Sequence, residues 1–245
     1  MVDRLYTDAR LAALYDRLYP LPQAPRDFYL PLIMAARSVL DVGCGTGALL
    51  AAARDAGHSG RLCGLDPAAA MLAQARKRAD IEWICGEAAA LGRSHEFDLA
   101  VMTGHAFQVL IEDLELRATL AAVHAALRPG GRFAFETRNP AARAWEQWTP
   151  ERLLQVDDGQ GNTVQVRWRI EAPFDGRTVS FAESYGSTGW DAPQVSHSVL
   201  RFLDADGVGR FLTGAGFVIE QQFGDFDRRR LAPDSPEILT IARAR

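Results

Sequence analysis

The stretch DVGCGTGA, residues 41–48, constrains the fold of this chain more than any other segment. It places Gly43, Gly45 and Gly47 between an apolar run, 38–42, and a helix-like run, 48–56. Glycine is a costly choice in regular structure, so such a loop is expected where the backbone comes very close to something else. A strand, a glycine-rich loop and a helix in this order indicate a nucleotide-binding α/β unit.

The spacing of the glycines is compatible with two classes of cofactor. Gly43-x-Gly45-x-x-Ala48 fits the fingerprint of dinucleotide-binding loops. Asp41-x-Gly43-x-Gly45-x-Gly47 fits a loop for a different nucleoside cofactor. Spacing alone therefore leaves both classes open.

Two aspartates next to this loop add information about the cofactor. Asp66 follows Gly47 by 19 residues and suits ribose hydroxyls in either class, or the N-cap of a helix with Pro67 at its first position. Asp41 lies in an apolar strand, where a carboxylate is costly unless it accepts hydrogen bonds. A carboxylate at this place would not help to bind the diphosphate of a dinucleotide. It would attract the cationic amino-acid tail of the other class of cofactor. Asp41 therefore disfavours NAD.

Strand-like and helical runs alternate along most of the chain, which predicts a doubly wound, mostly parallel sheet. Residues 1–35 are expected to form two helical segments broken at 19–25. One long helix is expected to present Leu116, Leu120, Val123 and Leu127 along one face. The expected strands are 38–42, 61–66, 81–85, 97–102, 128–137, 217–223 and 237–243.

A different pattern occupies residues 141–203. Residues 162–170 alternate apolar and polar side chains, as a half-exposed antiparallel strand does, and 177–185 and 195–203 alternate similarly. We therefore expect a core domain, 1–140 and 204–245, with a small antiparallel β insertion, 141–203, after the fifth strand.

Composition narrows the classes of function. A net charge of −4 and a pI near 5.8 give no bulk attraction to nucleic acid or an anionic membrane. Three isolated cysteines suggest a reducing cytoplasm, and no spacing of cysteines or histidines indicates a metal. No segment resembles a signal peptide or a membrane span. A cytoplasmic globular protein is expected.

Five motifs in order resemble those of the class I S-adenosylmethionine-dependent methyltransferases, of the small-molecule type with a methyltransferase type 11/25-like domain. They are VLDVGCGTG (39–47), GLDPAAAML (64–72), GEA (86–88), FDLAVMTGHAF (97–107) and LRPGGRFAFET (127–137). YDRLYP (15–20) resembles the N-terminal helix of such enzymes, and SPEILTIAR (235–243) their antiparallel last strand. The resemblance implies a Rossmann-like seven-stranded sheet, S-adenosylmethionine as the cofactor, and the insertion as a substrate lid.

The resemblance also implies roles for individual residues. Glu87 stands where the family more often has Asp. The residues expected to bind the cofactor are Tyr15, Asp41, Gly43, Gly45, Gly47, Asp66, Pro67, Met71, Glu87, Ala88, Thr103 and Gly104.

Candidates for the acceptor side follow from the ends of the strands and from the insertion. His105 is either a general base or a histidine bonded to loop backbone. Glu136 and Arg138 either bind the substrate or pair with each other. The residues expected to contact the substrate are Tyr19, Phe107, Glu136, Arg138, Trp168 and Tyr185. The insertion is either a lid that faces an anionic or aromatic substrate or a twisted sheet with a solvated arginine face. The side chains that would line such a lid are Arg167, Trp168, Arg169, Tyr185, His197 and Arg201.

The function expected from these features is in-line transfer of the sulfonium methyl group to oxygen, nitrogen or carbon of a small molecule. The alternatives are an RNA methyltransferase with the same core, a nicotinamide oxidoreductase, and a non-catalytic S-adenosylmethionine-binding regulator. We expect a monomer or homodimer with a small-molecule substrate and no membrane or nucleic-acid partner.

Overall fold

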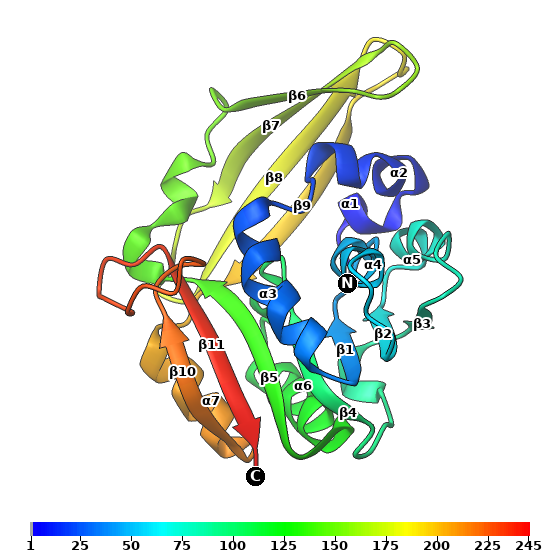
Figure 1. Cartoon of the computed structure of the whole chain (residues 1–245). Coiled ribbons are helices and arrows are strands. Elements are labelled where there is room, and N and C mark those ends of the chain that lie inside the picture. The colour runs from blue at the N-terminus through cyan, green and yellow to red at the C-terminus, as the bar shows by residue number, and fades with distance from the viewer. Residues whose placement is uncertain (1) are drawn as a thin grey trace.

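The computed structural model describes residues 2–245 and contains two separate β-sheets (Figure 1). The larger sheet has seven strands in the order β10-β11-β5-β4-β1-β2-β3. The last strand, β11, runs antiparallel to both of its neighbours. The strands are β1 (Ser38–Val42), β2 (Arg61–Asp66), β3 (Glu82–Cys85), β4 (Phe97–Met102), β5 (Leu127–Arg138), β10 (Phe217–Phe223) and β11 (Glu237–Ala244). The predicted Rossmann-like fold is confirmed.

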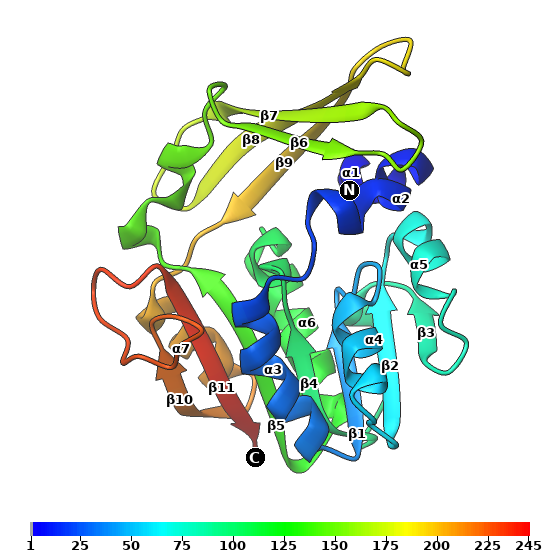
Figure 2. The same cartoon turned by 45° about the horizontal axis from the view of Figure 1, so that its top comes forward.

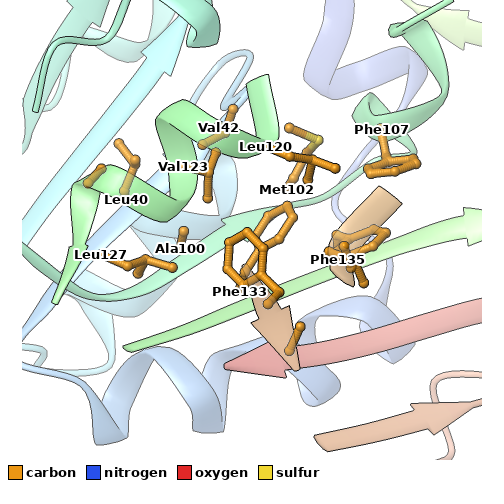
Figure 3. Close-up of a cluster of buried hydrophobic side chains, with 14 of the residues drawn as sticks. Leu40, Val42, Ala100, Met102, Phe107, Leu120, Val123, Leu127, Phe133 and Phe135 are labelled. Carbon is orange, nitrogen blue, oxygen red and sulfur yellow. The ribbon is translucent and has the colours of Figure 1, made fainter. Parts of the chain in front are cut away.

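Helices cover both faces of this sheet because alternate side chains of the buried strands point to opposite sides. One apolar cluster joins α6 and α7 to Leu40, Phe133 and Phe135 (Figure 3). A second joins α3 and α4 to Val39 and Leu99. The helices are α3 (Gln23–Ala35), α4 (Ala48–Asp55), α5 (Ala69–Ala75), α6 (Asp113–Ala126) and α7 (Ala205–Gly214). Short 3-10 helices follow several strands: η1 (Ala88–Ala90), η2 (Ala106–Val109), η3 (Pro140–Ala142) and η4 (Ala144–Gln147).

The second sheet is antiparallel, with the order β6-β7-β8-β9, and lies beyond the carboxyl ends of the parallel strands (Figures 1 and 2). Its inner face is the side that carries Val166 and Trp168 of β7 and Phe181, Glu183 and Tyr185 of β8. The first two helices pack with this face in one apolar cluster. These elements are β6 (Leu153–Asp157), β7 (Thr163–Ala172), β8 (Thr178–Ser187), β9 (Gln194–Arg201), α1 (Arg4–Thr7) and α2 (Ala9–Leu18).

Some element boundaries differ from the sequence prediction. Leu127 begins β5 instead of ending α6, because its backbone is already extended, with φ −77° and ψ 142°. Helix α3 begins at Gln23, inside the segment expected to break the helices; Pro25 lies in its first turn, where no backbone donor is needed. Strand β6 was not expected. The domain boundaries at residues 140 and 203 stay a prediction.

Candidate functional site

The glycine loop joins β1 to α4 at the carboxyl edge of the larger sheet. Gly43, Gly45 and Gly47 have φ values of +75°, +56° and +77°, which other residues adopt rarely. Added Cβ atoms at Gly43 and Gly47 would lie 2.9 Å from Ala106 Cβ and 2.2 Å from the Trp83 ring. A side chain at either position would clash with a neighbouring residue of the protein, so both positions require glycine.

Gly45 differs from the other two glycines in its surroundings. An added Cβ there would meet only the flexible end of the Met71 side chain, at 3.2 Å. Met71 itself is buried beside Ala12 and Ala68. Gly45 is therefore the loop position where the side chains of the protein leave most room.

Asp66 ends β2 and ties that strand to the glycine loop. Gly45 N–H donates to its Oδ2 and Ala68 N–H donates to its Oδ1, both at 2.8 Å. Burial raises the pKa of Asp66, and the two backbone donors oppose that rise. Because these bonds hold Asp66 and Pro67 in a turn, α5 begins only at Ala69. The expectation of Asp66 as N-cap with Pro67 at the first helical position is wrong.

Asp41 is almost fully buried at the end of β1, with 1% of its surface exposed. Burial, together with the charges of Asp66 and Glu136, raises its pKa to about 8. Its Oδ1 has no hydrogen-bond partner among residues 2–245. A buried oxygen without a donor is costly, and a cationic ligand group beside the loop would relieve that cost. This orphaned oxygen fits the amino group of the expected cofactor.

The other residues expected at the cofactor lie around the same edge. Tyr15 is half-buried on α2, where burial and nearby carboxylates raise its pKa to about 12. Thr103 and Gly104 follow β4, and an added Cβ at Gly104 would meet nothing within 4 Å. Pro67 and Glu87 are exposed, and Ala88 begins η1. No hydrogen bond of the Glu87 side chain is found within residues 2–245.

Four ionisable side chains meet after β4. His105 is the residue before η2 and has a left-handed backbone, with φ +62°. Its backbone N–H donates to Glu136 Oε1 at 3.0 Å, and Tyr29 O–H donates to Glu136 Oε2. Its ring Nε2 lies 3.0 and 3.1 Å from the two carboxylate oxygens of Glu237. Burial raises the pKa of Glu136.

Arg138, at the end of β5, does not pair with Glu136. Its Nη1 donates to Gln108 Oε1 at 2.9 Å, and its guanidinium lies 5.4 Å from the centre of the Trp148 ring. Gln108 is fully buried, and its Nε2 donates to the backbone oxygen of Arg201. Among the buried and half-buried arginines of residues 2–245, Arg138 alone has no carboxylate at ion-pair distance.

A buried carboxylate, Glu183, lies at the centre of the inner face of the four-stranded sheet. Its Oε1 accepts hydrogen bonds from Tyr19 O–H at 2.9 Å and Trp168 Nε1 at 2.7 Å. Its Oε2 accepts one from Tyr185 O–H at 2.9 Å. Burial raises the pKa of Glu183, and the three donors oppose that rise. Tyr19, Trp168 and Tyr185 are thus brought together around a residue the sequence did not single out.

The remaining candidates for the substrate site lie in the core or on the outer face of the four-stranded sheet. Phe107 is in the core, stacked on Phe135 with ring centres 4.5 Å apart (Figure 3), because η2 places its side chain in the apolar cluster that α6 and α7 form with the sheet. Arg167, Arg169 and His197 are exposed on the face opposite Trp168. The arginine face of the insertion is therefore solvated.

The sequence did not single out Glu183, Glu237, Gln108 or Tyr29. Glu183 carried a usable signal, since it interrupts the buried positions Val179, Phe181 and Tyr185 of an alternating strand. The sequence carried no such signal for Glu237, because its partner His105 is 132 residues away in the chain.

No helix among residues 2–245 combines the length and apolar character needed to cross a bilayer. Nor do three or more histidine, cysteine, aspartate or glutamate side chains gather as metal ligands in that part of the chain.

Comparison with known proteins agrees with the geometry. A family model described as a methyltransferase domain matches residues 39–131. The 2-phytyl-1,4-naphtoquinone methyltransferase of Thermosynechococcus vestitus is 35% identical in an alignment of 161 residues that covers 60% of this chain and 69% of that protein.

Solved structures show the same fold. The CcbJ methyltransferase of Streptomyces caelestis has a TM-score of 0.77 and 22% identity, covering 98% of this chain and 97% of that chain. CalS10, an amino pentose methyltransferase from Micromonospora echinaspora solved with S-adenosylmethionine, has a TM-score of 0.69 and 24% identity, covering 95% of each chain. The glycine loop, the strand order and these relatives together show that the chain belongs to the class I S-adenosylmethionine-dependent methyltransferases and uses S-adenosylmethionine as its cofactor.

Proposed function

We propose that this enzyme methylates a small molecule bound between the carboxyl edge of the seven-stranded sheet and the inner face of the four-stranded sheet. In this proposal residues 1–140 and 204–245 hold the cofactor, and residues 141–203 select the acceptor. Asp66 binds the ribose hydroxyls, since a carboxylate has about four acceptor positions and the backbone uses only two here. Asp41 faces the cationic amino group.

The observation that carries the acceptor assignment is the polar cluster around Glu183. Small-molecule sites combine apolar walls with a few fixed polar groups. The inner face is mostly apolar, yet it holds a buried carboxylate with three donors, one of which, Tyr19, directly follows α2. Such a cluster fixes the tyrosine hydroxyls in place before any ligand arrives.

Arg138 supplies a second polar group for the acceptor. Gln108 and Trp148 fix its guanidinium, while no carboxylate neutralises it at ion-pair distance within residues 2–245. An unpaired guanidinium presents several donors to a carbonyl, carboxylate or phosphate oxygen. In the proposal Arg138 therefore orients the acceptor.

The reaction needs little covalent help from the protein. When bound, S-adenosylmethionine supplies an electrophilic methyl group. The tyrosines and Arg138 hold the acceptor in line with it, the four-stranded sheet excludes water, and His105 takes a proton where the acceptor must lose one. The naphthoquinone and amino pentose methyltransferases among the relatives support a small acceptor.

A screen with methyl-tritiated S-adenosylmethionine tests this function. The protein is incubated with small hydroxylated, amino and quinone compounds and, separately, with total RNA. We expect label in the small-molecule fraction. Label in RNA alone would contradict the proposal, and so would cofactor binding by calorimetry with no transfer to any acceptor.

A further inference from the structure

His105 is held in a strained position beside the glycine loop. A non-glycine residue with φ near +62° is uncommon, and it persists only where the surroundings impose it. Two contacts do so here: the buried Glu136 accepts its backbone N–H at 3.0 Å, and the next residue, Ala106, lies against Gly43. The fold thus fixes an imidazole at the edge where the cofactor loop lies.

The Glu237 carboxylate determines which ring nitrogen carries the proton. Both its oxygens lie within 3.1 Å of His105 Nε2, and a carboxylate can only accept. Neutral His105 is therefore held with its proton on Nε2, which leaves a lone pair on Nδ1. No hydrogen bond to Nδ1 is found within residues 2–245.

Within residues 2–245, the other charged groups around His105 and Glu237 do not contact the imidazole ring. Glu136 is occupied by Tyr29 O–H and by the backbone of His105. Arg138 is the cross-strand neighbour of Glu237, but the two side chains form no ion pair. Glu237 is thus the carboxylate that contacts the imidazole ring.

We propose that Glu237 is a positioning residue that keeps Nδ1 of His105 free to accept a proton, and that the acceptor is therefore a hydroxyl or protonated amino compound. This inference rests on the proposed function. The acceptor gives its proton to Nδ1 and its lone pair to the methyl carbon, while the carbon–sulfur bond breaks and its electron pair stays on sulfur. The imidazolium, stabilised by Glu237, then releases the proton to water.

The first test measures the tautomer directly and needs no acceptor. The protein is labelled with ¹⁵N-histidine and saturated with S-adenosylhomocysteine in alkaline buffer, and the His105 signals are assigned with His105→Asn. We expect Nε2 protonated and Nδ1 unprotonated in the wild type and in Glu237→Gln, whose amide oxygen still accepts. Glu237→Ala should weaken this preference toward that of a free imidazole, which itself carries its proton mostly on Nε2. Protonated Nδ1 in the wild type, or an unchanged preference in Glu237→Ala, would overturn the inference.

The second test uses the best hydroxyl or amino acceptor from the tritium screen. Glu237→Gln removes the charge that stabilises the imidazolium, so we expect kcat to fall at least tenfold, with KM within about twofold. Glu220→Gln is the matched control, because Glu220 pairs with Arg132 and Arg243 on the same sheet without contacting His105. Equal kcat in both variants would also overturn the inference. A wild type that transfers no methyl group contradicts the proposed function instead, and leaves the tautomer measurement decisive.

Discussion

At the scale of single residues, the site is built from carboxylates whose burial is balanced by specific donors. Asp66 is satisfied by two backbone N–H groups, and Glu183 by three side-chain donors. Asp41 is the exception, since one of its oxygens has no partner within residues 2–245. Ligand binding should therefore change the hydrogen bonding of Asp41 more than that of Asp66 or Glu183.

Replacing Asp66 by Asn should weaken cofactor binding. The amide keeps one acceptor oxygen and loses charge-assisted hydrogen bonds, each of which contributes about 1.5–3 kcal/mol. Calorimetry should show affinity for S-adenosylmethionine falling at least tenfold. Asp98→Asn is the control, because Asp98 also accepts a backbone N–H, from Ser38 at the opposite end of β1. An equal loss of affinity in both variants would indicate a general effect on the sheet.

The pKa of Asp41 predicts a pH dependence of stability. Its pKa is about 8 in the folded protein, against an ordinary value of 3.8. Between these values the folded state holds a proton that the unfolded state has lost, so this group's contribution to the free energy of unfolding falls as pH rises. Asp41→Asn should therefore raise Tm relative to wild type, by more at about pH 8 than at about pH 5. A difference that is constant with pH would contradict this assignment.

The sequence could indicate the carboxylates that end buried strands, because a charge in an apolar run is visible in the chain itself. Asp41, Asp66 and Glu136 were found in this way. The partners of these groups were not visible. The contact between His105 and Glu237 depends on β11 pairing antiparallel with β5, which places Glu237 opposite Arg138.

At the scale of elements, alternation of side chains predicted β7, β8 and β9 well, because one face of each strand is buried. Strand β6 was missed since none of its residues is fully buried, so its sequence lacks that contrast.

Helix α2 has a role that its amphipathic pattern did not reveal. Its Asp16 accepts a hydrogen bond from Thr46 of the glycine loop at 2.6 Å, and Tyr19, just after it, bonds Glu183.

Glu183→Gln tests the cluster that joins α2 to the four-stranded sheet. Three donors then face an uncharged group with a single acceptor oxygen, so the charge-assisted hydrogen bonds weaken and unfolding should need about 1–3 kcal/mol less. We expect a raised KM for the acceptor and little change in cofactor affinity. Glu171→Gln, on the exposed side of β7, is the matched control. It should change neither the free energy of unfolding nor KM for the acceptor.

At the scale of the whole molecule, the two sheets are not independent. Leu5, Leu14 and Leu18 of the first two helices pack with the inner face, so deleting residues 141–203 would expose an apolar surface on the helices that also contact the glycine loop. Point variants therefore separate cofactor binding from acceptor selection better than a deletion does. The expected oligomeric state, monomer or homodimer, stays a prediction.

The most direct test of the central claim is a crystal structure of the protein with S-adenosylhomocysteine. The account predicts the ribose hydroxyls within hydrogen-bond distance of Asp66, the amino group beside Asp41 and Gly43, and the sulfur facing the inner face of the four-stranded sheet. A nucleoside bound away from Asp66, or a sulfur turned away from that sheet, would contradict it.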